Sequence, residues 1–467
     1  MSTSIVWFRR DLRLADNPAL AAAARAERIL PVFCFEDGPL RGRHHSPNRN
    51  AYLLASLREL GDGLRAAGAA LRYRSGDPAV ELPRLAAECG AEEVHVNRDH
   101  TAHARSRERR VAAALEEAGV KLVGHGGLTC AEPARITTAD GHPFRVFTPF
   151  HRAWLEAERR DPAPRPRSLE EPAGIAVGRP PSEADVAVDA AAKRRAEEAK
   201  AGERRSRELM RRAIERAGDY DRIRDLPGRD ETTRLSPALH FGTVSALELE
   251  RELASKRSDG AKALRRQLAW RDFWLNVIRN NPGNRNEEYD ERFRGMSWRD
   301  DPESLEAWRR GRTGVPWIDS GMRQLLEEGW MHNRVRMAVA SYLTKNLLID
   351  WREGEAHFMR HLLDGDESQN NGNWQWAASV GADPQPYFRI FNPVRQQERF
   401  DPGGEYVRRW VPELRRFPDG HLAAPWEAPE EVQREAGCVV GEDYPEPLVD
   451  LRDSREEAIS RFRDQAG

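Results

Sequence analysis

Five short apolar runs, rich in β-branched and aromatic residues, alternate with helix-like stretches over the first part of the chain. The stretches that favour helices are 47–67, 81–88 and 102–117. Strands that alternate with helices form parallel sheets joined by right-handed crossovers. Residues 1–130 are therefore predicted to form a doubly wound α/β domain. The predicted strands are 5–8, 29–35, 71–74, 93–97 and 120–124.

A proline-rich stretch follows this alternation. Residues 161–182 contain six prolines and two glycines, which is too many for a helix or a central strand. We therefore expect a connector over residues 131–200. Beyond it the chain is rich in Ala, Glu, Arg and Lys, and most segments are typical of helices separated by short Gly or Pro stretches. Residues 201–467 are predicted to form an all-α domain.

The composition is that of a soluble globular protein with more than one domain, since 39% of the 467 residues are apolar and 32% are charged. No apolar run of about 18 residues occurs, and the N-terminus lacks the apolar region of a signal peptide. We expect a cytoplasmic protein. The four cysteines are far apart and form no close-spaced metal pair, which favours free thiols in a reducing compartment.

The net charge is only -2, which excludes a general nucleic-acid coat, so any DNA contact must come from a local basic patch. Residues 329–349 contain Arg334, Arg336 and Lys345 and no Asp or Glu. They form either such a patch or a buried helix whose cations meet acids elsewhere.

The stretch 364–376 is both polar and aromatic. Its glycines allow close backbone approach, its amides donate and accept hydrogen bonds, and its indoles offer flat surfaces. It either binds a planar heteroaromatic molecule with a polar edge or forms a surface loop followed by an amphipathic helix. The residues concerned are Asp364, Asp366, Glu367, Asn370, Asn371, Trp374 and Trp376.

Two further patterns have alternative interpretations. In TTRLSP, residues 232–237, hydroxyl groups and an arginine near a helix start suit a diphosphate, although Ser-Pro is also a common helix cap. His357 and His361 lie four residues apart and with Asp364 or Asp366 would suit a metal. No glutamate lies between the two histidines to act as a base, so no metal is predicted.

All but two of the 13 tryptophans lie between Trp270 and Trp426. Five motifs, most of them in this part of the chain, together with DGDESQNNGNWQW resemble the photolyase and cryptochrome family of blue-light flavoproteins, and within it the class I photolyases for cyclobutane pyrimidine dimers. The motifs are VWFRRDLRLADNPAL (6–20), TTRLSPALHFG (232–242), LAWRDF (268–273), GWMHNRVRM (329–337) and LLIDWREGE (347–355).

The resemblance implies an FAD cofactor. Residues 232–236 would hold its phosphates, Asp364 and Asp366 its ribityl and isoalloxazine region, and Arg336 would pair with Asp364. Asn370 would face the flavin N5, where a neutral amide cannot readily protonate a reduced flavin, which favours repair over signalling. The implied FAD residues are Tyr220, Thr232, Thr233, Arg234, Leu235, Ser236, Arg336, Asp364, Gly365, Asp366 and Asn370.

Trp374, Trp351 and Trp298 match the three tryptophans that carry electrons from the surface to the flavin in this family. Three tryptophans are also ordinary core residues, and their spacing in the sequence does not give their distances. A second group matches positions that contact a flipped pyrimidine dimer. It consists of Arg224, Gln267, Trp270, Asn333, Arg334, Met337, Trp376 and Gln396.

One position departs from the pattern. Many photolyases for cyclobutane dimers have Glu where this chain has Gln267, and Gln is typical of the enzymes for (6-4) photoproducts. Those enzymes need two histidines where this chain has Asn333 and Met337. We therefore predict light-driven repair of cyclobutane dimers by electron transfer from reduced FAD, with a cryptochrome-like photoreceptor as the alternative. The expected partner is UV-damaged DNA, and we expect a monomer.

The resemblance also raises the question of which second, light-harvesting chromophore the protein binds. Folate-binding members carry an Asn-Glu pair where this chain has His103 and Ala104. The spacing of Arg105 and Arg107 is more similar to that of members that bind a deazaflavin. A deazaflavin is therefore favoured over a folate, with an empty pocket as the alternative.

Overall fold

The computed structural model describes residues 2–384 and 388–466, and these residues cluster into two compact units. Each unit is assembled from several chain segments. The first unit comprises Met1–Asp219, Thr233–Pro282 and Leu363–Ser368. The second comprises Tyr220–Thr232, Gly283–Leu362 and Gln369–Gly467.

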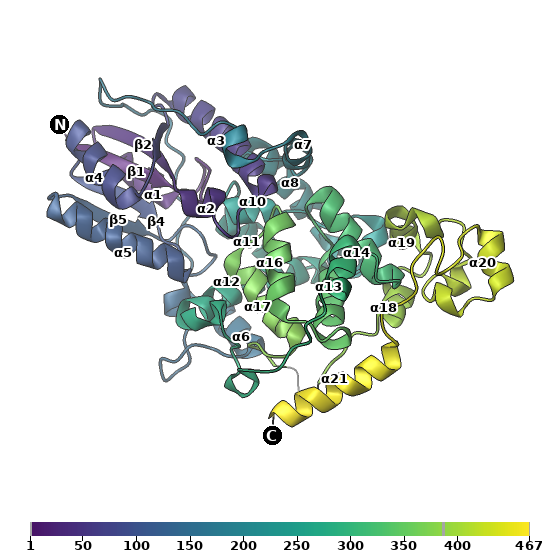
Figure 1. Cartoon of the computed structure of the whole chain (residues 1–467). Coiled ribbons are helices and arrows are strands. Elements are labelled where there is room, and N and C mark those ends of the chain that lie inside the picture. The colour runs from purple at the N-terminus through teal and green to yellow at the C-terminus, as the bar shows by residue number, and fades with distance from the viewer. Residues whose placement is uncertain (1, 385–387, 467) are drawn as a thin grey trace. The chain divides into compact units, whose positions relative to one another are not determined.

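The first unit contains a five-stranded parallel sheet with the strand order β3-β2-β1-β4-β5. This confirms the predicted doubly wound α/β domain. Strands β1, β2, β4 and β5 are labelled in Figure 1. The strands are β1 Thr3–Phe8, β2 Arg28–Phe35, β3 Arg72–Ser75, β4 Glu93–Asn97 and β5 Lys121–His125. The helices are α1 Pro18–Ala23, α2 Asp37–Arg41, α3 Pro47–Ala67, α4 Pro78–Cys89, α5 Ala102–Glu117, α6 Phe147–Glu156, α7 Ala190–Glu198, α8 Glu203–Glu215, α10 Ser236–Phe241, α11 Ala246–Ala254 and α12 Asp259–Asn280.

The central strands β1, β2 and β4 are buried, and successive side chains of a strand point to opposite faces of the sheet. In β1, Val6 and Phe8 join one hydrophobic cluster with residues of α3 and α7, whereas Ile5 and Trp7 join another with residues of α4 and α5. Strands covered by helices on both faces are expected to be continuously apolar. That property explains why the strands were visible in the sequence.

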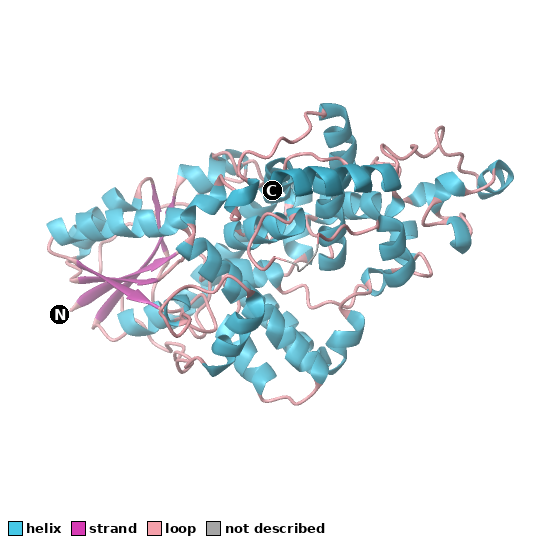
Figure 2. Cartoon of the chain, turned by 90° about the horizontal axis from the view of Figure 1, so that it is seen from below, coloured by secondary structure: helices cyan, strands magenta, loops and turns pink. Residues whose placement is uncertain are grey.

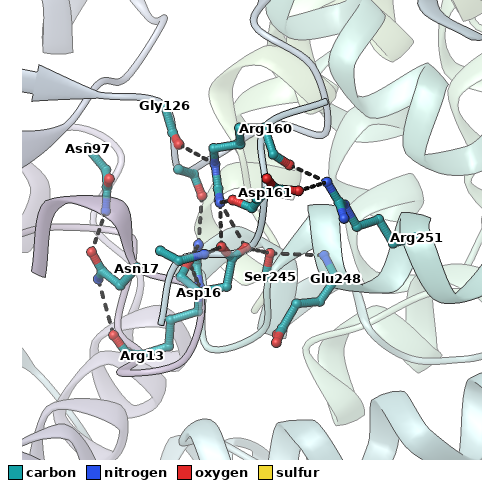
Figure 3. Close-up of polar contacts among 12 residues, drawn as sticks. Arg13, Asp16, Asn17, Asn97, Gly126, Arg160, Asp161, Ser245, Glu248 and Arg251 are labelled. Carbon is teal, nitrogen blue, oxygen red and sulfur yellow. Dashed lines mark hydrogen bonds and ion pairs between the residues drawn. The ribbon is translucent and has the colours of Figure 1, made fainter. Parts of the chain in front are cut away.

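The loop after β1 is fixed by Asp16, which is 1% exposed (Figure 3). Asp16 accepts hydrogen bonds from Arg160 Nη2 at 2.9 Å and from Ser245 Oγ, and the backbone N–H of Ala163 donates to it at 2.8 Å. Burial alone would raise the pKa of Asp16, but Arg160 and Arg13 hold it below its ordinary value. A buried anion thus joins β1, the proline-rich connector and α11 within this unit.

The second unit is helical, and all named strands belong to the first (Figure 2). Its largest hydrophobic cluster is rich in tryptophan and includes Trp308, Trp317, Trp351 and Trp374. Between α15 and α16 lies a π-helical turn at Tyr342–Asn346. The helices are α9 Tyr220–Ile223, α13 Pro302–Arg310, α14 Pro316–Glu328, α15 Asn333–Ser341, α16 Trp351–His361, α17 Glu367–Ala378, which begins in the first unit, α18 Pro393–Phe400, α19 Glu405–Trp410, α20 Glu430–Ala436 and α21 Leu451–Ala466.

Candidate functional site

Asp366 is the centre of a buried charge network in the first unit. It is 5% exposed and immediately precedes α17. Its Oδ2 forms an ion pair with Arg10 Nη1 at 2.7 Å and lies 3.5 Å from His240 Nδ1, while its Oδ1 accepts the backbone N–H of Ser368 at 2.9 Å. Arg10 comes from the loop after β1, so residues 356 positions apart meet at this carboxylate.

Arg10 connects two carboxylates, because its Nε also lies 3.3 Å from Asp99 Oδ2. Burial alone would raise the pKa of both acids, but the charge of Arg10 holds the pKa of Asp99 at about 2 and that of Asp366 well below its ordinary value. Both acids are therefore anions at neutral pH. Arg10 was not identified from the sequence, because its partner Asp366 lies 356 positions away in the chain.

The predicted phosphate segment adopts an unusual backbone conformation. Arg234 has a φ of 47°, in the left-handed region, and Thr233 Oγ1 accepts the backbone N–H of Leu235 at 3.4 Å. Such a conformation in a residue other than glycine costs energy and is found preferentially at functional sites. Helix α10 begins at Ser236, as the Ser-Pro pair indicates.

Of the four residues expected at FAD that belong to the second unit, Thr232 and Tyr220 lie in its first segment. Thr232 Oγ1 is buried and has no hydrogen-bond partner among residues 2–384 and 388–466. Tyr220 begins α9, and burial raises the pKa of its hydroxyl group to about 12, so the hydroxyl stays protonated. An unpaired buried hydroxyl group is costly in a folded protein. It fits a site completed by a polar ligand.

Asn370 lies on α17 and is 7% exposed. Its Nδ2 donates to the backbone oxygen of Glu355 at 3.0 Å and to Glu355 Oε1 at 2.9 Å. Because both partners are acceptors, the amide nitrogen must face Glu355 and the amide oxygen must face away from it. The orientation of the Asn370 amide is thus fixed by the protein. Its proximity to a flavin stays a prediction.

Trp374 is 2% exposed, and its ring packs against the backbone of α16 at Gly354, one turn after Trp351. Its other aromatic neighbours are Phe358, at 5.0 Å between ring centroids, and Trp308, at 6.1 Å. Trp308 was not predicted to have a role. The structure therefore places the Trp374 ring, which belongs to α17, against the end of α16 that begins with Trp351.

Trp351 is 1% exposed and its Nε1 donates to Glu288 Oε1 at 3.2 Å. Trp298 is partly buried and its ring lies 6.2 Å from that of Phe462 on α21. The Trp298 Nε1 is buried without a hydrogen-bond partner among the described residues. That electrons pass along Trp298, Trp351 and Trp374 stays a prediction.

Gly354 gives a direct test of the position of Trp374. A Cβ atom at this residue would overlap Cη2 and Cζ3 of Trp374. Gly354→Ala is expected to lower the free energy of unfolding by about 1–3 kcal/mol because the core is overpacked, although alanine normally favours a helix over glycine by about 1 kcal/mol. Urea unfolding measures the change. Gly420→Ala is the control, since a Cβ there meets nothing within 4 Å, and equal stabilities of the two variants would contradict the packing.

The predicted lesion contacts in the first unit lie on α12. Trp270 is half-buried and stacks on Phe147, with ring centroids 3.6 Å apart and planes within 5°. Gln267 lies one turn before Trp270, and its Nε2 is 3.4 Å from the backbone oxygen of Ala263. The two residues predicted for this role are thus neighbours on one face of a helix.

The remaining predicted lesion contacts belong to the second unit. Arg334 Nη2 forms an ion pair with Asp225 Oδ1 at 2.7 Å, and its guanidinium lies 4.3 Å from the ring centroid of Phe400. On α15, Asn333 is exposed, and its Nδ2 lies 3.8 Å from Met337 Sδ. In the same unit Arg336 donates to the backbone oxygen of Met331 at 2.8 Å, and Arg224 lies 3.8 Å from Asp225. Two buried polar atoms, Trp376 Nε1 and Gln396 Oε1, have no hydrogen-bond partner among the described residues.

Lys345, in the π-helical turn, is buried at 2% exposure. Its Nζ donates to Ser379 Oγ at 2.7 Å and to the backbone oxygen of Arg389, and lies 4.8 Å from the ring centroid of Phe388. Burial, together with the charge of Arg389, lowers the pKa of Lys345 to about 7. Lys345 is thus buried and is not part of a basic surface patch. For this residue the interpretation of 329–349 as a buried helix is the correct one.

This pKa predicts a pH-dependent stability. The unfolded chain holds the Lys345 proton up to about pH 10, whereas the folded chain releases it near pH 7, so the stability contributed by Lys345 rises with pH between these values. Between about pH 7 and pH 9, the free energy of unfolding of wild type is expected to rise by about 2 kcal/mol relative to that of Lys345→Met. Denaturant titrations of both proteins measure this difference. Lys262→Met, at a residue whose side chain is 65% exposed, serves as the control, and parallel pH profiles for wild type and Lys345→Met would contradict the prediction.

The residues considered for an antenna lie on or near α5 in the first unit. Arg107 is 9% exposed, forms an ion pair with Glu36 and lies 5.2 Å from the ring centroid of Trp7. Arg105 Nη1 donates to the backbone oxygen of Arg279 at 2.8 Å. Both arginines thus have partners within the protein, and the choice of chromophore stays a prediction.

The rings of His357 and His361 have centroids 4.5 Å apart and planes tilted by 47°. Within residues 2–384 and 388–466, the structure contains no group of three His, Cys, Asp or Glu side chains arranged to hold a metal ion. In the same residues, no helix has both the length and the apolar character needed to cross a membrane.

Comparisons with known proteins agree with this architecture. Residues 4–168 match the family model described as DNA photolyase, and residues 264–464 match the FAD binding domain of DNA photolyase. A parallel α/β unit combined with a helical FAD binding domain places the chain among the flavoproteins. More particularly, the chain belongs to the DNA photolyase family.

Individual relatives cover nearly the whole chain. The deoxyribodipyrimidine photo-lyase of Streptomyces griseus is 41% identical over 97% of this chain and 98% of its own length. A bacterial class III photolyase from Agrobacterium tumefaciens is 36% identical, with a TM-score of 0.92 over 100% of this chain and 98% of its own. A cryptochrome from Synechocystis is 28% identical, with a TM-score of 0.89 over 98% and 99%.

Proposed function

We propose that this protein is a deoxyribodipyrimidine photo-lyase, which uses light to split cyclobutane pyrimidine dimers in DNA by electron transfer from reduced FAD. The observation that carries the proposal is the 41% identity to a relative of that name over almost the full length of both chains. When bound, FAD supplies the light absorption and the transferred electron, and the protein supplies position and electrostatics.

The residues present fit this cofactor. Thr232 Oγ1 and Ser368 Oγ are buried and lack partners among the described residues, as expected for groups that meet a polar ligand. In our proposal the anionic Asp366, held by Arg10, accepts hydrogen bonds from the cofactor. The residues that would hold FAD are Tyr220, Thr232, Thr233, Arg234, Leu235, Ser236, Arg336, Asp364, Gly365, Asp366 and Asn370.

The lesion would be held by aromatic walls, amides and cations. Trp270, supported by its stack on Phe147, and Trp376 offer flat surfaces for an extruded base. Amide groups meet the imide edges of the pyrimidines, and arginines meet the phosphates. Extrusion of a damaged pair costs only a few kcal/mol because its stacking is already weakened. The proposed contacts are Arg224, Gln267, Trp270, Asn333, Arg334, Met337, Trp376 and Gln396.

Repair of an irradiated oligonucleotide by purified protein tests the proposal. The protein is expected to carry a flavin absorption spectrum, and dimers are expected to disappear in blue light and to persist in the dark. Protein that contains no flavin after ample flavin supply would contradict the whole proposal. Flavin photoreduction without any repair would support the cryptochrome-like photoreceptor instead.

A second prediction concerns which lesion is repaired, and it is based on Gln267. Its amide still donates to a pyrimidine carbonyl, but it lacks the charge-assisted bond of a glutamate, a difference of about 1–2 kcal/mol. We expect repair of cyclobutane dimers, no repair of (6-4) photoproducts and a higher quantum yield in Gln267→Glu. Oligonucleotides with one defined lesion, assayed with Gln267→Met as the control, measure all three. A quantum yield in Gln267→Glu at or below that of wild type would show that the other residues of the lesion pocket favour an amide over a carboxylate at this position.

We propose a cytoplasmic monomer with a deazaflavin as the antenna, if one binds. The free state of all four cysteines supports a reducing compartment. Light scattering measures the mass in solution, and the spectrum of the chromophore released from purified protein distinguishes a deazaflavin from a folate. Near-stoichiometric methenyltetrahydrofolate would exclude the deazaflavin.

A further inference from the structure

Trp351 is contacted by an acid, Glu288, and by a cation, Arg352. The same oxygen atom of Glu288 meets both the indole N–H and the guanidinium group. Trp351 Nε1 donates to Glu288 Oε1 at 3.2 Å, and Arg352 Nη1 lies 2.9 Å from the same oxygen. The guanidinium carbon of Arg352 lies 4.6 Å from the Trp351 ring centroid. Glu288 is 3% exposed, so its charge acts on the indole with little screening by water, whereas the Arg352 side chain is 31% exposed.

The two charges have opposite effects on an indole that loses an electron. Oxidation leaves a positive charge on the ring, which the guanidinium of Arg352 repels and the carboxylate of Glu288 attracts. Asp350 adds a further negative charge, because its Oδ1 lies 3.1 Å from Arg352 Nη1. The acids therefore offset a cation that would otherwise make Trp351 difficult to oxidise.

The position of Glu288 is fixed by the helix that carries Trp374. Gln375, 1% exposed, donates from Nε2 to the backbone oxygens of Asn284 at 2.9 Å and Glu287 at 3.1 Å, and its Oε1 accepts the N–H of Tyr289 at 2.8 Å. These bonds hold the backbone on both sides of Glu288. One turn of α17 thus positions both an indole and the acid that contacts the next indole.

We propose that Glu288 is a positioning residue for photoreduction, which makes Trp351 oxidisable by compensating the charge of Arg352 and orienting the indole N–H. This rests on the proposed function. When bound and excited by light, FAD would supply the oxidising power. Trp374 would give up one electron, and Trp351 would then give one electron to the Trp374 ring, which would become neutral again. Trp351 becomes a cation radical. In the proposed step the Nε1 proton stays on the indole, hydrogen-bonded to Glu288 Oε1.

Transient absorption after a laser flash tests the proposal on four forms of the flavin-loaded protein, which are wild type, Glu288→Gln, Arg352→Met and the double variant. Glu288→Gln is expected to slow electron transfer from Trp351 by about tenfold, because the negative charge that contacts the indole is lost and only Asp350, 3.1 Å from Arg352 Nη1, still offsets the arginine. The double variant removes both charges and should return to within about threefold of wild type. Glu287→Gln is the matched control, since the Glu287 side chain is 59% exposed.

Two further measurements separate this role from a merely structural one. In the dark, the indole ¹⁵N–¹H resonance of Trp351 should shift in Glu288→Gln, while the other tryptophan resonances away from the substitution stay unchanged. Chemically reduced forms of all variants should repair dimers at the wild-type rate, which tests the proposed function separately.

Several outcomes would overturn the inference. These are a wild-type rate in Glu288→Gln, a double variant as slow as Glu288→Gln, or slower Trp351 oxidation in heavy water, which would show that the proton moves. Wild-type protein that repairs dimers when chemically reduced but is not photoreduced would also overturn it, and would leave the proposed function standing.

Discussion

Trp374→Phe is expected to slow photoreduction of oxidised FAD by at least about a hundredfold, because phenylalanine is far harder to oxidise than tryptophan and the indole at this position is the proposed first electron donor. Repair by enzyme reduced chemically beforehand should remain close to wild type. The fold should tolerate the change, since phenylalanine keeps an aromatic ring among Phe358, Trp308 and Gly354 at a cost of about 1–2 kcal/mol. Flavin absorbance under continuous blue light, with an external reductant, measures the rate.

Trp308→Phe is the matched control for this experiment. Trp308 is fully buried, and its ring lies 6.1 Å from that of Trp374, so both variants change the same aromatic cluster. Only Trp374→Phe should block photoreduction. If Trp374→Phe is photoreduced at the wild-type rate, Trp374 is not the first donor, and a loss confined to Trp308→Phe would assign that role to Trp308.

Asp366→Asn is expected to reduce the flavin content of purified protein by more than about tenfold and to lower the free energy of unfolding by about 3 kcal/mol. Asparagine keeps an acceptor for the Ser368 N–H, but it cannot balance Arg10, whose Nη1 lies 2.7 Å from Asp366 Oδ2. Removal of one partner leaves a buried charge uncompensated, which typically costs 3–5 kcal/mol. Here the loss should lie at the lower end because Asp99 remains 3.3 Å from Arg10.

Asp161→Asn provides the comparison for this variant. Asp161 also pairs with an arginine, Arg251, at 3.0 Å, but its side chain is 96% exposed. Exposed pairs contribute about 0–1 kcal/mol, so flavin content and stability should be unchanged. The flavin to protein absorbance ratio and urea unfolding measure both effects. Normal flavin content in Asp366→Asn would show that the carboxylate is not needed to hold the cofactor.

The parallel sheet could be predicted because its central strands, β1 and β2 above all, are local apolar runs and its strands alternate with helical stretches. The helix predicted at 47–67 is α3, Pro47–Ala67, with Ser46 as its cap. By contrast, Arg10 and Glu288 were not found. Their roles depend on contacts with Asp366 and Trp351, which are distant in the sequence, and no local pattern reports such pairs.

The stretch 364–376 shows the limit most clearly. The alternative interpretation was a surface loop followed by an amphipathic helix. It is wrong about exposure, because the polar residues Asp366, Asn371 and Gln375 are buried. Periodicity assigns polar residues to the outside of a helix. In α17 the polar side chains instead bond to backbone of other segments, as Asn371 does to Asn284 at 2.9 Å. Only the tertiary structure provides those partners.

The discontinuous first unit has a consequence for synthesis on the ribosome. Leu363–Ser368 belong to the same unit as the sheet, so the partner of Arg10 is made long after the strands. At about 5–20 residues per second, translation from Pro282 to Ser368 takes roughly 4–17 s. During this time Arg10 has emerged without Asp366, and a nascent chain that stops before Leu363 cannot complete this unit. Fragments cut at the proline-rich connector should therefore expose to chaperones and proteases an arginine that has lost one of its two carboxylate partners and retains only Asp99.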